Sequence, residues 1–517
     1  MSRDRLLDRR ERRNAQGEVR QAETIQRIRG LAGDVPGRVV AEQLDPRAVA
    51  LEVDGPQPEI RESDQAFRVG ARDREPGPLL EPERVAVERD AAVEVRDTDS
   101  DVGETRDGHR PSLLDPRPAE TAPGRRVARD RGRRHTLAVR RAAAIVGIGQ
   151  TEFSKNIGRP ERTVALEAIR AALADAAIAP AEVDGLVRFD LETTSEVEIA
   201  RNLGIPNVRF FSEIAYGGGA GCGTVAHAAM AIAQRQASVV VCWRARNRSS
   251  GGRPWAATGA GVGGDYQFTA PYGLVRPADQ IAMLARRHMH EYGTTSADLG
   301  AVAVTCRTHA SRNPRAMMRE PMTLADHQAS RMISDPLRKF DCCLETDGAL
   351  AVVVVSAERA RDLPQKPAYV LAAAQGTGPE HVVMTDYYGP HFLQTPSTCV
   401  ARDLFASAGV SPTDLDCAQF YDAFTPLVLL SLEEFGFCKP GESGPMASSG
   451  ALMWPDGKLP TNTSGGGLSE AYVHGFNLIL EGVRQIRGTS TSQVDGCEIA
   501  FVAGGSTDPT GAVILRR

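Results

Sequence analysis

The sequence contains few aromatic residues and no pattern that marks a disulfide framework, a thiolate metal site or a membrane segment. Phe, Trp and Tyr make up 5% of its 517 residues. The nine cysteines are scattered, odd in number and without a Cys-x-x-Cys pair, which argues against disulfides and a thiolate zinc site. No run of about 18 apolar residues predicts a membrane span. The opening residues, MSRDRLLDRRERR, lack the apolar core of a secretory signal, so we expect a cytoplasmic protein.

Residues 1–137 contain no lysine, tryptophan or tyrosine, and Phe67 is their only aromatic residue. Arginine, acidic residues and proline dominate the segment instead. Such a composition cannot bury enough apolar surface to offset the entropy lost on ordering. We therefore expect a disordered or wrongly assigned N-terminal extension without a function. Acidic residues alternate with the arginines, and the formal net charge is -5, which argues against a nucleic-acid-binding arm.

The pattern of a folded α/β domain begins at residue 142. The stretch AAAIVGIGQTEF (142–153) predicts a short buried strand, and residues 163–178 carry apolar side chains at helical spacing. Pro180 follows the end of this helix, and EVDGLVRFD (182–190) predicts a second strand. The alternation of strand and helix predicts an α/β domain with a largely buried sheet.

An internal repeat organises this part of the chain. Residues 172–190 match residues 404–422, and each copy reads as a helix, a proline turn and a strand. A glycine-rich turn and a helix follow each copy, and each half ends in an apolar strand, at 237–245 and 496–505. Three matches in the same order predict a duplicated α/β unit, whose copies pack sheet against sheet or helix against helix.

Three stretches show that residues 142–517 resemble the thiolase superfamily, in particular its sterol-carrier-protein-x or lipid-transfer-protein type. This resemblance implies the α/β duplicated thiolase fold, with five layers (αβαβα) and usually a homodimer. It divides the globular part into an N-terminal half with a loop region, 138–365, and a C-terminal half, 366–517. The stretches are AAIVGIGQTEF (143–153), QIAMLARRHMHEYGTT (280–295) and DPLRKFDCCLETDGALAVVVVSAERA (335–360).

Thiolases of this family use a nucleophilic Cys, an Asn or His beside an acidic residue, a His in a Gly-His-Pro turn, and a second Cys. The matching motifs put Gly218 and Gly505 at the two Cys positions. Tyr421 takes the Asn position and Tyr472 the His position. A thiolase needs a thiolate to hold the acyl group, so the usual thiolase reaction is expected to fail. Cys222, one helical turn after Gly218, is either a displaced nucleophile or a buried packing cysteine.

The groups that remain fit a retro-aldol reaction, which splits a β-hydroxyacyl-CoA into a ketone or aldehyde and a shorter acyl-CoA. The reaction needs a base, donors for the thioester enolate and an acid, but no covalent nucleophile. We expect Tyr421 to be the proton donor and Tyr472 the base, because Asp422 would repel a phenolate beside it. Alternatively, each tyrosine only fills the space left by a smaller residue.

Further candidates surround the two tyrosines. Asp422 is expected to orient a donor, and His474 is either a proton shuttle or a packed histidine. Gly466 lies in the glycine-rich turn TSGGGLS (463–469); with Gly218 and Gly505 it is expected to bring backbone N–H groups to the thioester oxygen. We expect no cofactor apart from the coenzyme A of the substrate, and no metal site.

The resemblance also implies a substrate. Members with tyrosine at these positions are similar to actinobacterial aldolases that cleave a 17-hydroxy steroid C22-CoA ester to a 17-ketosteroid and propionyl-CoA. They work with the OB-fold/zinc-ribbon domain of a companion enoyl-CoA hydratase. The alternatives are a non-catalytic scaffold or lipid-transfer subunit of a hydratase complex, and a thiolase or acetyl-CoA acetyltransferase that uses Cys222. The apolar segment 424–437 either lines a steroid pocket or belongs to the core.

Overall fold

The computed structural model of the chain describes residues 142–215, 218–251, 266–378, 393, 396–505 and 510–517. All of them belong to one compact unit, residues 117–517. The predicted N-terminal extension, residues 1–137, lies outside the described residues. Within the described ranges, no helix combines the length and the apolar character that a membrane span needs.

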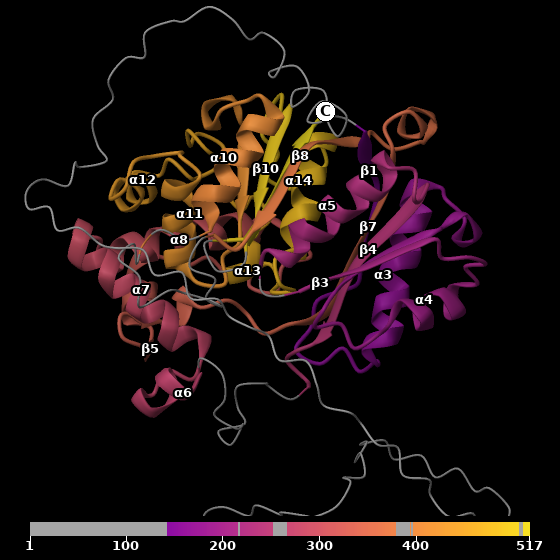
Figure 1. Ribbon diagram of the computed structural model, residues 1–517. Coiled ribbons are helices and arrows are strands. Elements are labelled where there is room, and N and C mark those ends of the chain that lie inside the picture. Colours follow the sequence, from indigo (N-terminus) through magenta and orange to yellow (C-terminus); the bar gives the residue numbers. More distant parts are fainter. Residues whose placement is uncertain (1–141, 216–217, 252–265, 379–392, 394–395, 506–509) are drawn as a thin grey trace, which may run out of the picture. The chain divides into compact units, whose positions relative to one another are not determined.

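The described strands form a mixed nine-stranded sheet and a two-stranded sheet (Figure 1). The order in the large sheet is β3-β2-β4-β7-β1-β8-β11-β10-β9, and β5 pairs with β6. The strands are β1 (Ala143–Gln150), β2 (Gly185–Phe189), β3 (Phe210–Ile214), β4 (Val239–Asn247), β5 (Met332–Ser334), β6 (Leu337–Arg338), β7 (Asp347–Ser356), β8 (Ala368–Gly376), β9 (Cys417–Phe420), β10 (Ile499–Ala503) and β11 (Thr510–Arg516).

The helices that cover the large sheet include the predicted helix at 163–178, which is α3. The described helices are α3 (Glu161–Ala176), α4 (Glu196–Leu203), α5 (Ala220–Ala233), α6 (Tyr266–Thr269), α7 (Pro277–Tyr292), α8 (Ser296–Arg312), α9 (Leu324–Ala329), α10 (Ser397–Ala408), α11 (Thr425–Glu434), α12 (Ser443–Ser448), α13 (Gly466–Ser469) and α14 (Phe476–Arg487).

Apart from β3 at one edge, the strand order is symmetric about the contact between β1 and β8. Moving outward, β1, β7, β4 and β2 on one side correspond to β8, β11, β10 and β9 on the other. The outermost pair of each set is parallel and the inner pairs are antiparallel. This symmetry confirms the predicted duplication. The halves pack helix against helix through α5 and α14, but they also join edge to edge where β1 pairs with β8, a contact that the repeat did not predict.

The two halves of the large sheet form two β layers, and helices lie outside each half and between the two, which gives five layers in all. Helix α3 packs on β1, β4 and β7, and α10 packs on β8 and β11. Helices α5 and α14 lie between the two halves and contact strands of both (Figure 1). The αβαβα arrangement of the thiolase fold, predicted from the resemblance, is therefore confirmed.

Strand β7 explains why a layer of helices can cover each face. Its apolar run is buried along almost its whole length, as expected for a strand covered on both faces. Successive side chains point to opposite faces of a strand. Accordingly, Ala351 and Val353 belong to the core beneath α3, whereas Val352 and Val354 belong to the core that contains α5.

A glycine in β1 allows α3 to approach the sheet closely. A Cβ atom on Gly149 would collide with backbone atoms of Ala168 and Ala172 in α3. Backbone atoms of a packed helix cannot move aside without displacing the helix, so overpacking here is costly.

We therefore expect Gly149→Ala to lower the free energy of unfolding by about 2 kcal/mol or more, measured by urea denaturation. Gly376→Ala in β8 is the matched control, because its Cβ would meet only Val400 Cγ2, at 3.5 Å. The control should cost less than about 1 kcal/mol. Equal losses in the two variants would contradict this account of the close approach.

Candidate active site

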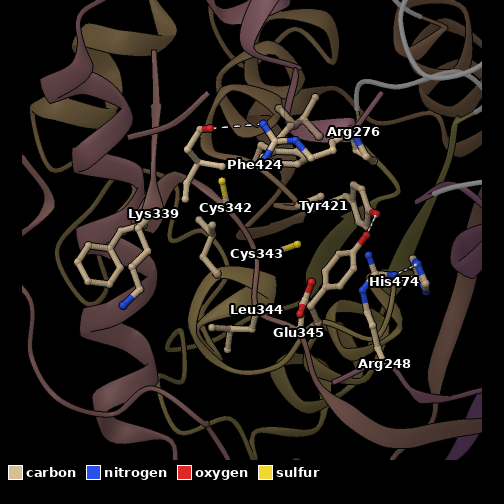
Figure 2. Close-up of a pocket in the computed structure, with 18 of the residues that line it drawn as sticks. Arg248, Arg276, Lys339, Cys342, Cys343, Leu344, Glu345, Tyr421, Phe424 and His474 are labelled. Atoms are coloured by element: carbon tan, nitrogen blue, oxygen red, sulfur yellow. Dashed lines mark hydrogen bonds between the residues drawn. The ribbon is translucent and has the colours of Figure 1, made fainter. Parts of the chain in front are cut away.

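A cavity of about 650 Å³ lies where loops of the two halves meet. Tyr421 follows strand β9, Tyr472 follows helix α13, and Gly218 precedes helix α5. All three line the cavity, together with Arg248 from the end of β4 and Cys343 from the segment before β7. In Figure 2, Tyr421, Arg248 and His474 lie at one end of the cavity and Lys339 lies at the other.

Two buried tyrosines form the polar centre of this end. Their hydroxyl groups hydrogen-bond to each other, and their ring centroids are 6.0 Å apart. The backbone N–H of Tyr421 donates to the Ala503 carbonyl at 3.1 Å, and that of Tyr472 donates to Thr346 Oγ1 at 3.1 Å. The structure thus brings together the two side chains that the sequence proposed as an acid–base pair.

Three glycines enclose the ring of Tyr421. A Cβ atom on Gly218 would lie 2.5 Å from Tyr421 Cε1, and one on Gly505 would lie 2.7 Å from Tyr421 Cδ1. A Cβ atom on Gly475 would lie 2.8 Å from Tyr421 Cδ2. The ring therefore fills the space that side chains at 218 and 505, the two positions matched to thiolase cysteines, would need.

Burial raises the pKa of both phenols. The pKa of Tyr421 lies well above its ordinary value because of burial and then the charge and hydrogen bond of Tyr472. The pKa of Tyr472 is raised to about 12, first by burial and then by Cys343, while Arg248 and the hydrogen bond from Tyr421 oppose the rise. Either hydroxyl group can be the donor of their hydrogen bond, and Tyr472 is the one of the two that ionises more readily.

His474 lines the cavity beside the tyrosines, and its ring is fixed by Arg244 and Phe189. Its Nδ1 accepts hydrogen bonds from Arg244, and its ring stacks on Phe189 with the centroids 5.4 Å apart. Burial and the charges of Arg244 and Arg248 hold the pKa of His474 well below its ordinary range. Its imidazole is therefore neutral at physiological pH, which suits an orienting residue better than the predicted proton shuttle.

Asp422 points away from the cavity into the glycine-rich turn. Its carboxylate accepts the N–H groups of Gly467 at 2.7 Å and Leu468 at 3.1 Å, and the Cys306 thiol lies 3.7 Å away. A Cβ atom on Gly466 would collide with the same carboxylate. Burial raises the pKa of Asp422 to about 6. Asp422 thus anchors the turn that precedes Tyr472. The sequence analysis had predicted a different role for it, the orientation of a proton donor.

The other predicted residues lie behind the cavity wall. Gly466 and Gly505 are not among the residues that line the cavity. Their predicted role, to bring backbone N–H groups to the thioester oxygen, therefore stays a prediction. The Cys222 thiol is buried in the core against the Val502 carbonyl, at 3.7 Å, and burial raises its pKa to about 12. This position favours the packing cysteine over the displaced nucleophile.

The sequence did not reveal the cationic lining of the cavity. Its basic side chains come from five separate segments, and no local motif shows that they converge. Glu345 is the one carboxylate among the described lining residues. In the described part of the chain, no group of three or more His, Cys, Asp or Glu side chains is arranged to hold a metal ion. The basic residues are Lys155, Arg248, Arg276, Arg307, Arg331 and Lys339.

Comparisons with known proteins point in one direction. A family described as thiolase C-terminal domain-like matches residues 382–517. The 17-hydroxy-3-oxo-4-pregnene-20-carboxyl-CoA lyase of Mycobacterium tuberculosis is 50% identical over 72% of this chain and 98% of its own length. The steroid side-chain-cleaving aldolase of Thermomonospora curvata is 51% identical over 72% of this chain and 97% of its own length. The solved structure named Ltp2-ChsH2(DUF35) aldolase has 50% identity and a TM-score of 0.70, and the match covers 73% of this chain and 98% of that one.

The glycine cradle of Tyr421 yields a stability prediction. Gly218→Ala should lower the free energy of unfolding by about 1–3 kcal/mol, because the new methyl group overlaps the tyrosine ring and the Gly504 carbonyl. In a chain that already carries Tyr421→Ala, the same glycine substitution should cost less, since the ring that it would overlap is absent. Urea denaturation of the two single variants and the double variant measures this coupling. Strictly additive losses would show that the ring and Gly218 do not compete for space.

Asp422 yields a pH prediction. Its pKa is raised from about 3.9 in an unfolded chain to about 6. The protonated carboxyl therefore favours the folded state below pH 4, and this contribution is lost as pH rises through 6. Relative to Asp422→Asn, which cannot ionise, the native chain should lose about 2 kcal/mol of stability between pH 4 and pH 7. Parallel stability curves for the two proteins would contradict the raised pKa.

Proposed function

The chain belongs to the thiolase superfamily, and on this premise we propose that it is an acyl-CoA retro-aldolase, a carbon–carbon lyase that needs no nucleophilic cysteine. The observation that carries the proposal is the hydrogen-bonded pair of Tyr421 and Tyr472 in the cavity. The ring of Tyr421 occupies the space beside Gly218 that a nucleophilic side chain would use. Proton transfer thus replaces covalent catalysis.

The two phenols can divide the proton transfers of the reaction. Tyr472 removes the proton of the β-hydroxyl group, and the electron pair of that O–H bond forms the new carbonyl group. The bond between Cα and Cβ breaks, and its electrons move into the thioester as an enolate. Tyr421 protonates Cα, giving the shorter acyl-CoA. The raised pKa of each phenol keeps it protonated at neutral pH, so little Tyr472 phenolate is present and the base step of Tyr472 sets the pH dependence.

The rest of the cavity suits an acyl-CoA ester. Phosphate groups of coenzyme A need positive partners, and among the described residues Arg307, Arg331 and Lys339 form no ion pair with a carboxylate. Phe424 and Leu427 from the predicted apolar segment line the cavity, whereas most of α11 belongs to the core. A long cavity with a cationic end, a tyrosine end and apolar walls accommodates a bulky acyl group joined to coenzyme A.

We propose a 17-hydroxy steroid C22-CoA ester as the substrate, with a 17-ketosteroid and propionyl-CoA as products of steroid side-chain degradation. The relatives named for this chemistry support the choice, at 50% and 51% identity over almost their whole lengths. The solved relative, Ltp2-ChsH2(DUF35) aldolase, is named with a ChsH2(DUF35) component. We therefore propose that this chain acts with a companion DUF35-type hydratase domain, as a homodimer in the cytoplasm.

The test is a product assay with the full chain, its companion domain and the 17-hydroxy steroid acyl-CoA, in which propionyl-CoA is measured by mass spectrometry. Tyr472→Phe and Tyr421→Phe should each lower kcat/KM roughly 100-fold or more, because each removes a proton-transfer group. Cys222→Ala should keep its activity, since its thiol lies outside the cavity.

Near-ultraviolet circular dichroism checks that each variant is folded. Loss of turnover in Cys222→Ala alone would favour a thiolase that uses this cysteine. A chain that turns over no substrate, with or without the companion domain, would favour the non-catalytic scaffold.

A further inference from the structure

We propose that Arg248, which lies beside His474 and over the ring of Tyr472, is a positioning residue whose fixed positive charge stabilises the phenolate of Tyr472. The inference rests on the proposed function, in which Tyr472 is the base. It adds a residue that no sequence motif marks. His474 accepts from Arg244 through Nδ1, so its Nε2 carries the proton and makes a packing contact with Arg248, not a hydrogen bond.

The support of the His474 ring begins with a buried ion pair in strand β4. Nη1 of Arg244 lies 2.5 Å from Oε1 of Glu192, and the two side chains are 0% and 1% exposed. The same carboxylate oxygen accepts the N–H of Ala245 at 2.8 Å. Removing either partner would leave a buried charge without compensation, so this pair is costly to break. Arg244 is therefore a rigid donor directed at the next residue of the network.

That next residue is His474. Arg244 donates to Nδ1 of His474 from Nη2 at 2.7 Å and from Nε at 3.1 Å. The ring packs between Phe189 and Tyr472, with centroid distances of 5.4 Å and 5.1 Å. The imidazole is thus oriented by two N–H donors of Arg244 on one edge, by the stacked ring of Phe189 and by the tilted ring of Tyr472.

Arg248 lies at the opposite edge of the imidazole and against the catalytic ring. Its Nη1 is 3.1 Å from Nε2 of His474, and its Cζ is 5.0 Å from the ring centroid of Tyr472. The chain after Arg248 is fixed, because Asp347 Oδ1 accepts the next two backbone N–H groups at 2.6 and 3.1 Å. Figure 2 shows Arg248 and His474 next to each other at the tyrosine end of the cavity. A guanidinium held over an aromatic face is attracted to it, and more so when both are shielded from water.

The charges around Tyr472 act in opposite directions. Burial and Cys343 raise its pKa, whereas Arg248, the hydrogen bond from Tyr421 and Arg244 lower it. Arg248 also opposes the rise in the pKa of Tyr421 and of the Cys343 thiol, so one guanidinium acts on both phenols and on this thiol. The groups that face the ring from the surrounding elements are Tyr421 after β9, Cys343 and Glu345 before β7, and Arg244, Arg248 and His474.

The prediction is a displaced pH profile. Arg248→Met removes the charge but keeps a chain of similar bulk, so the phenolate of Tyr472 forms only at higher pH. The limb of kcat/KM that rises with pH should move up by roughly one to two pH units, which lowers activity at neutral pH about 10- to 100-fold. Arg248→Lys keeps the charge and should retain most of the activity. Arg209→Met is the control, because Arg209 is half-exposed and pairs with Asp184 at 3.3 Å; its profile should match that of the native chain.

A second measurement separates this inference from the proposed function. The full chain carries 3-fluorotyrosine at position 472, and its ¹⁹F resonance is followed against pH without substrate. The resonance should titrate at higher pH in Arg248→Met than in the native chain, and close to the native value in Arg248→Lys. If Arg248→Met does not fold, Arg248→Gln takes its place.

If the ¹⁹F resonance of Arg248→Met titrates at the same pH as in the native chain, the inference is overturned. If Arg248→Lys shows the same shift as Arg248→Met, the inference is also overturned, because the positive charge is then not the cause. A charge-dependent ¹⁹F titration in a chain that turns over no steroid ester supports the electrostatic role of Arg248 and rejects the retro-aldolase. A retro-aldolase whose pH profile ignores Arg248 keeps the proposed function and rejects the inference.

Discussion

The ring of Tyr421, enclosed by three glycines, is the contact on which the geometry of the site depends. Gly218 lies before α5, Gly475 directly precedes α14, and Gly505 follows β10, so the ring joins elements of both halves. Each glycine leaves room that a side chain would take. The hydroxyl group then meets Tyr472, and the position of that bond sets where a substrate carbon can lie.

The turn that carries Tyr472 is fixed by a second, separate constraint. Asp422 follows Tyr421 directly, but its carboxylate binds the amides of α13 behind the cavity. Tyr421 and Asp422, which follow each other after β9, thus point to opposite sides of the cavity wall. Tyr421 faces the cavity, and Asp422 holds the segment that leads to Tyr472. The alternation of side chains along an extended segment is the physical cause of this division.

Electrostatics set the limits of the chemistry. Burial raises the pKa of both phenols, which keeps them protonated at neutral pH and leaves little phenolate to act as a base. The cations along the cavity counter this burial at one end and offer partners for phosphates at the other. A thiolase-like scaffold can therefore change from covalent catalysis to proton transfer by replacing a few side chains, while the five layers stay in place.

The alternation of strand and helix, the duplication and the two tyrosines followed from the sequence, because hydrophobic periodicity and local motifs are properties of neighbouring residues. Local motifs could not show that Asp422 points away from the cavity, that Cys222 lies in the core, or that β1 joins β8. Those facts depend on which faces pack together. The same holds for Arg248 and the other cations, which come from segments far apart in the chain and converge only when the two halves fold around α5 and α14. The sequence by itself determined the fold and the two tyrosines that we propose as an acid–base pair. The charges around these tyrosines were decided by tertiary structure, since electrostatic interactions depend on distance in space and on burial.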